Sequence, residues 1–158
     1  MTNIERISEE KLQPSEKSTE ANKKWGTDVI KLGFSIIPSL LFRAQRRLGL
    51  NPTQLAILLQ LADYWWSVDN KPYPSKSALS ERLGIGPRQI QRYIADMEQA
   101  GLVTRIQRYG DDKRKLSNHY DLSGLVERLK QLEPEFKEVE NEAKEKRRKI
   151  SRRGGLKS

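Results

Sequence analysis

The stretch 77–97 reads SALSERLGIGPRQIQRYIADM and decides the fold of this chain. A short helix is predicted up to Leu83, and Gly84 ends it, since glycine is the usual residue just past a helix. Pro87 suits the first turn of a second helix, which Gly101 terminates. The stretch therefore predicts two helices joined by a turn of about three residues.

Apolar residues at helical spacing predict how these two helices pack. They would share a seam made of Leu79, Leu83, Ile85, Ile90 and Ile94. On the second helix, Ile90, Tyr93, Ile94 and Met97 cluster on one side of the helical wheel. A polar face lies opposite, and its most prominent residues are Arg88, Gln89, Gln91 and Arg92.

A braced second helix with arginine and glutamine on its outer face is typical of a helix-turn-helix. Arginine pairs with guanine edges, and glutamine with adenine edges, in the major groove of DNA. We therefore predict that Arg88, Gln89, Gln91 and Arg92 read bases from a recognition helix spanning residues 87–100. The alternative is an ordinary solvated helix face, because both residue types are good helix formers.

Two β-like segments, 102–109 and 115–122, follow the recognition helix, with Gly110, Asp111 and Asp112 as a hairpin tip. A hairpin in this place forms a wing that can lie along the phosphate backbone or enter the minor groove. The alternative is a plain solvated hairpin. The residues predicted to hold phosphates are Ser75, Lys76, Ser77, Arg105, Arg108, Lys113, Arg114 and Lys115, and either Ser75 or Ser77 caps the first helix.

The stretch 74–94, with MEQAGLV at 97–103 and SNHYDL at 117–122, resembles the winged helix-turn-helix families of bacterial, plasmid and phage proteins. The resemblance covers residues 50–125 and departs at Gly86, where these families commonly carry an N-cap serine. It implies a DNA-binding winged helix of the type found in transcriptional regulators and replication initiators. The expected fold class is mainly α with a small antiparallel β-hairpin.

Three regions are expected along the chain. Residues 1–24 are polar and predicted to be a disordered arm, and residues 25–133 form the winged helix-turn-helix domain. Within that domain we expect a short strand at 33–37, a helix at 38–48 and a buried helix starting at Asn51-Pro52. A last helix, capped by Ser123, is interrupted or restarted at Pro134, and residues 134–158 are a charged helix and basic tail.

Composition limits the possible chemistry. The chain of 158 residues carries 30 Lys and Arg against 21 Asp and Glu, a net charge of +9 that favours a polyanionic partner. Cysteine is absent, which excludes disulfides, zinc ribbons and thiol nucleophiles. Without an apolar span or a secretory signal, a cytoplasmic, nucleoid-associated location is expected. The single histidine, His119, is interpreted as structural or as a phosphate contact, and we expect no metal, no cofactor and no catalysis.

Three functions remain open: a sequence-specific transcriptional regulator, a plasmid or phage replication or partition protein that recruits host machinery through its ends, and a protein-interaction module. Because one small domain binds a half-site weakly, a homodimer is expected. Spare leucines at 123–132 or 38–48 would supply its interface. The tail at 144–158, with eight basic residues against one acid, either binds phosphates or is a solubilising end.

Overall fold

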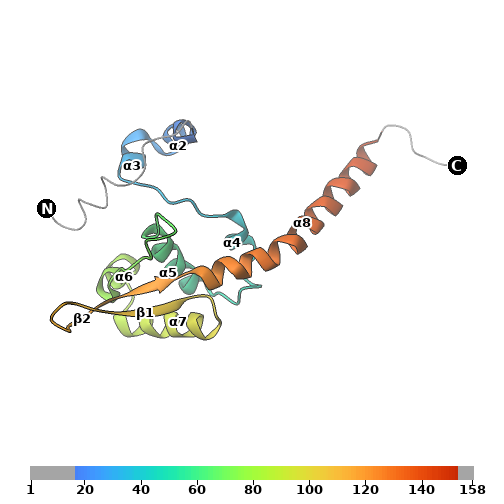
Figure 1. Cartoon of the computed structure of the whole chain (residues 1–158). Coiled ribbons are helices and arrows are strands. Elements are labelled where there is room, and N and C mark those ends of the chain that lie inside the picture. The colour runs from blue at the N-terminus through green and yellow to red at the C-terminus, as the bar shows by residue number, and fades with distance from the viewer. Residues whose placement is uncertain (1–16, 153–158) are drawn as a thin grey trace.

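The computed structural model describes residues 17–152 and is mainly helical, with one antiparallel hairpin (Figure 1). This arrangement confirms the predicted fold class. The elements are α2 (Lys17–Trp25), α3 (Thr27–Lys31), α4 (Ser39–Arg43), α5 (Pro52–Asp63), α6 (Lys76–Leu83), α7 (Pro87–Gln99), β1 (Thr104–Tyr109), β2 (Lys115–Asp121) and α8 (Ser123–Ser151).

Side-chain caps fix where the first helices of the domain begin. The Asn51 side chain accepts a hydrogen bond from the Gln54 amide at 2.8 Å, and the Gln54 side chain accepts one from the Asn51 amide at 2.9 Å. This reciprocal capping box, with Pro52 at the first helical position, confirms the predicted start of α5. At α6 the cap is Ser75, whose hydroxyl accepts from the Ala78 amide at 3.0 Å, rather than Ser77.

The hairpin is held in register over most of its length. Thr104 pairs with Asp121 and Ile106 with His119, after which a bulge shifts the pairing toward the tip. The segment before α6 also reaches the hairpin, because the Tyr120 amide donates to the Pro72 carbonyl at 2.8 Å. The wing is therefore tied to the helix-turn-helix at both its β1 and its β2 side.

The core lies between α4, α5, α6, α7, the hairpin and the first turns of α8. Ile57, Leu61, Leu79 and Ile90 are completely buried at its centre. Each such side chain contributes roughly 1.5–3 kcal/mol by leaving water. Trp65, which follows the C-terminal end of α5, packs against this cluster as well.

Helix α8 runs without interruption through Pro134, where we expected a break or a restart. Proline lacks the amide that would bond to the Lys130 carbonyl one turn back, but Lys130 is exposed, so water can satisfy that carbonyl. Its start also differs from expectation. Ser123 does not cap α8, because the N-cap residue is Leu122 and no side chain caps the helix; the Asp121 carboxylate accepts a bond from the Ser123 amide at 2.9 Å. That bond holds the pKa of Asp121 below its ordinary value.

A close backbone contact sets the direction in which α8 leaves the domain. The Leu125 amide donates to the Leu102 carbonyl at 2.9 Å. A Cβ placed on Gly124 would lie only 2.1 Å from the Gly101 carbonyl oxygen, so no side chain fits at this position. The first turn of α8 therefore rests directly on the loop between α7 and β1.

Three expectations for the N-terminal region are wrong. Residues 33–38 form no strand, and the helix expected over 38–48 is limited to α4, followed by turns as far as Gly49. The segment expected to be disordered up to residue 24 is helical over Lys17–Trp25, while residues 1–16 lie outside the described part of the chain. Helical pattern reading missed α2 because its sequence is almost entirely polar.

The leucines expected to form a dimer interface are used inside the chain. Leu41, Leu48, Leu125 and Leu132 are all buried in the core where α4 and the turn after it meet α8. Ion pairs reinforce this contact, with Arg47 lying 2.8 Å from Glu135 and Arg43 lying 2.6 Å from Glu140. These leucines are therefore not available to a second copy.

Candidate nucleic-acid interface

The turn between α6 and α7 has the tight geometry that the sequence predicts. Gly84 takes a left-handed conformation with φ of 66°, which ends α6 at little cost for a residue without a Cβ. The Ser80 hydroxyl then donates to the Ile85 carbonyl, so the turn is bonded back onto α6. This pairing fixes where α7 starts relative to the domain.

One face of α7 is anchored and the other is open. Ile90, Ile94 and Met97 are almost completely buried against the core. Arg88 and Arg92 are exposed and have no hydrogen bond or ion pair with any residue in the range 17–152. The predicted division of α7 into an apolar inner face and a basic outer face is present in the structure.

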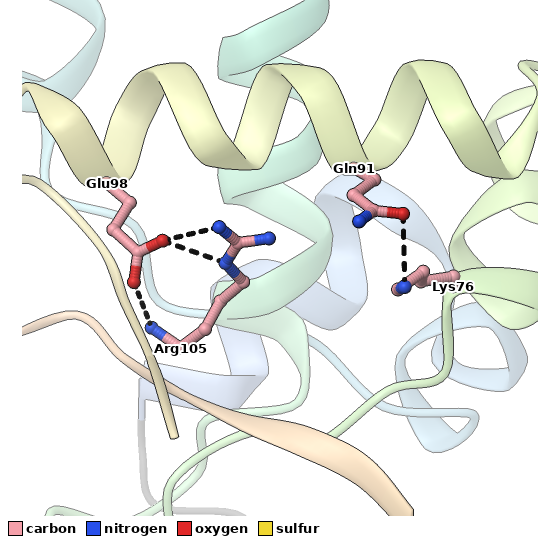
Figure 2. A network of polar contacts seen from close by, with 4 residues as sticks. All are labelled: Lys76, Gln91, Glu98 and Arg105. Carbon is pink, nitrogen blue, oxygen red and sulfur yellow. Dashed lines mark hydrogen bonds and ion pairs between the residues drawn. The ribbon is translucent and has the colours of Figure 1, made fainter. Parts of the chain in front are cut away.

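The two glutamines of this face differ in their contacts. Gln89 is exposed, whereas the Gln91 side-chain oxygen accepts a bond from the Lys76 ammonium at 3.2 Å (Figure 2). That contact places the charge of α6 beside the middle of α7. Gly86 precedes α7 and provides no side-chain cap, so the amides of its first turn carry the partial positive charge of a helix N-terminus.

Arg105, predicted to bind phosphate, is instead bonded to α7. Its Nε and one terminal nitrogen donate to Glu98 Oε2 at 2.9 and 2.6 Å, and its amide donates to Oε1 at 3.1 Å (Figure 2). These bonds hold the pKa of Glu98 below its ordinary value, first through the backbone amide and then through the side chain. The pair joins the end of the recognition helix to the first strand of the wing.

Arg108 is likewise engaged within the fold. Its guanidinium lies 4.6 Å from the centre of the Tyr73 ring and donates to the Ser117 carbonyl at 3.3 Å. The other neighbour of Tyr73 is His119, whose ring meets it edge-on at 5.6 Å. Burial, and then the charge of Arg108, lower the pKa of His119, which keeps the imidazole neutral at pH 7. This is the structural role expected for His119.

The tip of the wing presents the remaining bases. Lys113 takes a positive φ of 61° that closes the loop, and the Gly110 amide donates to the Arg114 carbonyl at 2.8 Å. The Asp112 carboxylate accepts from the Arg114 amide at 3.1 Å, so this acid shapes the tip. Lys113, Arg114 and Lys115 are exposed there.

A shallow groove between α6 and the wing contains two residues that the sequence did not indicate as contacts, Gln107 and Asn118. It is lined by Lys76, Gln107, Lys115 and Asn118, among others. Gln107 lies at the bulge of β1, where strict alternation of inward and outward residues breaks down. No periodic pattern in the sequence locates such a bulge, which is why Gln107 was missed. The predicted contact Ser77 is exposed, whereas Ser75 is occupied as the cap of α6.

The described residues were also compared with the requirements of a metal site and of a membrane-spanning helix. No group of three or more histidine, cysteine or acidic residues in the range 17–152 is placed to hold a metal ion. Over the same range, no helix combines the length and the apolar character that crossing a bilayer requires.

The match to a family model agrees with this geometry. Residues 48–103 match the family model of a helix-turn-helix domain, and the search of curated proteins finds no match. Among solved structures, the chain is similar to the N-terminal domain of DnaD protein from Geobacillus kaustophilus HTA426. The identity is 18% and the TM-score 0.48, over 84% of this chain and 99% of that one. Residues 48–103 are thus similar to helix-turn-helix domains, and with the hairpin that follows α7 the fold of residues 48–122 is that of a winged helix.

Proposed function

We propose that this chain binds double-stranded DNA in a sequence-specific manner, with α7 in the major groove. One observation carries the proposal: Arg88 and Arg92 project from a helix whose opposite face is buried, and neither has a hydrogen-bond or ion-pair partner among residues 17–152. Side chains on an anchored helix lose little further freedom when they meet a ligand, which favours selective contacts. The major groove, about 12 Å wide, accepts one helix of this size.

The chemistry of the α7 face fits base edges. A guanidinium presents two parallel donors, which match the O6 and N7 acceptors of guanine. Gln89 offers a donor and an acceptor, which match adenine, and it is free of other contacts in the described residues. Gln91 reads a base only if Lys76 releases it, and in that case the Lys76 ammonium becomes available to a phosphate.

The backbone contacts are assigned to exposed groups. Lys76 and Ser77 at the start of α6, together with Lys113, Arg114 and Lys115 at the wing tip, are placed to hold phosphates on either side of α7. Arg105 and Arg108 act differently in this proposal. They set the position of the wing through Glu98 and Tyr73, and they contact DNA only secondarily.

The biological role we propose is transcriptional regulation by binding, without turnover of a substrate. Selection of bound duplexes from a random pool, read by sequencing, tests the binding proposal, and enrichment of one short motif is expected. Footprinting on matching natural DNA then tests the role. A single site that overlaps a promoter supports regulation, whereas tandem sites at a plasmid or phage origin replace it with replication initiation. Failure to enrich any sequence overturns specific binding.

A further inference from the structure

Helix α8 carries an apolar stripe that continues beyond the domain. Its apolar residues are separated alternately by four and three positions, which is the heptad spacing of a coiled-coil seam. The first part of the stripe packs on the core through Leu125, Leu129, Leu132 and Phe136. The second part continues the spacing through Val139, Ala143, Lys146 and Ile150, with Lys146 as its one polar residue. Its apolar residues are exposed, with Val139 at 65% and Ile150 at 78%.

The free part of α8 is also polarised in charge. Every residue from 137 to 152 is exposed, and Figure 1 shows this end of α8 projecting away from the domain, opposite the wing tip. Residues 137–143 hold three glutamates and one lysine, whereas residues 144–152 hold six bases and one glutamate. Such a helix complements a second copy of itself only when the two run in opposite directions.

We propose that the free parts of α8 from two copies of this chain pair as a short antiparallel coiled coil. The heptad places Val139 against Ile150 of the second copy and Ala143 against Lys146 of the second copy. Alanine leaves room there for the lysine stem to reach water. In a parallel pair, Lys146 would instead face Lys146 of the second copy, and the like charges would repel.

The charges of the flanking positions agree with the antiparallel register. They bring Glu142 beside Lys149 of the second copy and Glu140 beside Arg147 of the second copy, so that each flanking contact joins opposite charges. Within one chain, Glu140 is paired with Arg43 and Lys149 with Glu145, so both residues share or exchange these partners when the helices pair. The two-fold axis of this register lies between Lys144 and Glu145.

Engineered cysteines test the pairing, because the chain has none of its own. Val139→Cys and Ile150→Cys are made as separate variants of the full chain and oxidised alone and mixed. Within one helix the two positions are about 16 Å apart, too far for an internal disulfide. A disulfide-linked dimer is expected only in the mixture. Cross-linking of either variant alone would replace the proposal with a parallel pair, and no cross-linking at all would overturn it.

A matched control uses the outer face of the same helices. Asn141 and Arg148 lie at the same level along the antiparallel pair as each other, but away from the seam. Mixed Asn141→Cys and Arg148→Cys are therefore expected to stay monomeric in gels without reductant. Equal cross-linking of this control mixture would mean that collisions, and not a seam, join the chains.

Charge reversal gives a second, reversible readout by sedimentation. Lys149→Glu places two glutamates together where Glu142 and residue 149 of the two copies meet, and it is expected to weaken the dimer about tenfold. Adding Glu142→Lys restores opposite charges and is expected to restore the dimer. A double variant as weak as the single one would contradict the register, with circular dichroism checking that α8 stays helical.

Discussion

Arginines of the recognition helix and arginines of the wing strand carry the same charge but have opposite roles in this molecule. Arg88 and Arg92 on α7 have no partner in the described chain, whereas Arg105 is bonded to Glu98 and Arg108 is stacked on Tyr73. The first pair is available to a ligand and the second pair organises the surface that presents it. A count of positive charges therefore overestimates the basic groups that are available to a ligand. The arginines with partners inside the fold have to be subtracted from that count.

The largest effect is expected from removing the free arginines. Arg88→Ala with Arg92→Ala should weaken specific DNA binding by roughly 2–5 kcal/mol, because two paired contacts to base edges are lost. The melting temperature should stay unchanged, since both side chains are exposed and make no hydrogen bond or ion pair within residues 17–152. Fluorescence anisotropy with the selected duplex measures the affinity.

The matched control removes two exposed arginines on the α4–α8 side, Arg46 and Arg128. This variant loses the same charge and should keep specific binding. If the α7 variant folds correctly and binds DNA as tightly as the control, the α7 face is a protein-interaction surface and the comparison fails.

The bonded arginine should show the reverse pattern. Arg105→Ala is expected to lower the free energy of unfolding by about 1–2 kcal/mol, because the Glu98 carboxylate loses two charged bonds at a partly buried place. Its specific DNA affinity should fall much less than that of the α7 variant. Urea unfolding and anisotropy on one preparation separate the two effects. A variant of full stability that no longer binds DNA would make Arg105 a direct contact.

The exposed lysines of the wing tip should contribute to DNA binding by a similar amount whatever the base sequence. Lys113→Ala with Lys115→Ala is expected to weaken binding to all duplexes by a similar factor. It should also reduce the slope of log affinity against log salt by about 2, if each lysine neutralises one phosphate. A salt titration from low to high ionic strength measures this. Selective loss for one sequence would instead place the tip among the base-reading residues.

The smallest effect concerns acid stability. The lowered pKa of Glu98 in the folded state means that its carboxylate stabilises the fold above the ordinary pKa of 4.5. This contribution is lost as the pH falls through the lowered value. Glu98→Gln should therefore be less stable than the parent chain at pH 7 by about 1 kcal/mol or less, with the difference shrinking below pH 4.5. Chemical unfolding at several pH values checks this. A difference in the free energy of unfolding that stays constant with pH would mean that titration of Glu98 does not cause it.

The sequence was sufficient for the parts of the fold that local signals encode. Asn51-Pro52, Gly84 and Pro87 mark helix ends through backbone preferences that act within a few residues, and the structure confirms each of them. Pro134 misled the prediction, because a proline at an exposed position of a long helix costs less than the rest of the helix gains. The strand expected at 33–37 does not form, since no strand in the described range lies beside it to pair with it.

The interface divides in the same way. The outward direction of Arg88 and Arg92 follows from helical periodicity alone and could be predicted. The engagement of Arg105 depends on Glu98, seven positions earlier, and on how the wing folds back onto α7. Contacts of this kind, and the bulge at Gln107, arise from tertiary geometry that no spacing in the sequence reports.

Because Gly124 has no side chain, the start of α8 can lie against the Gly101 carbonyl, and this sets the angle at which α8 leaves the domain. Even an alanine at 124 would push the start of α8 aside, because its methyl carbon cannot approach an oxygen that closely. Such a change would alter the direction of the whole of α8. It would leave the arginines of α7 and the residues at the far end of α8 unchanged. In a dimer paired through α8 as proposed, the missing side chain at Gly124 would therefore set the distance and the relative rotation between the two α7 helices.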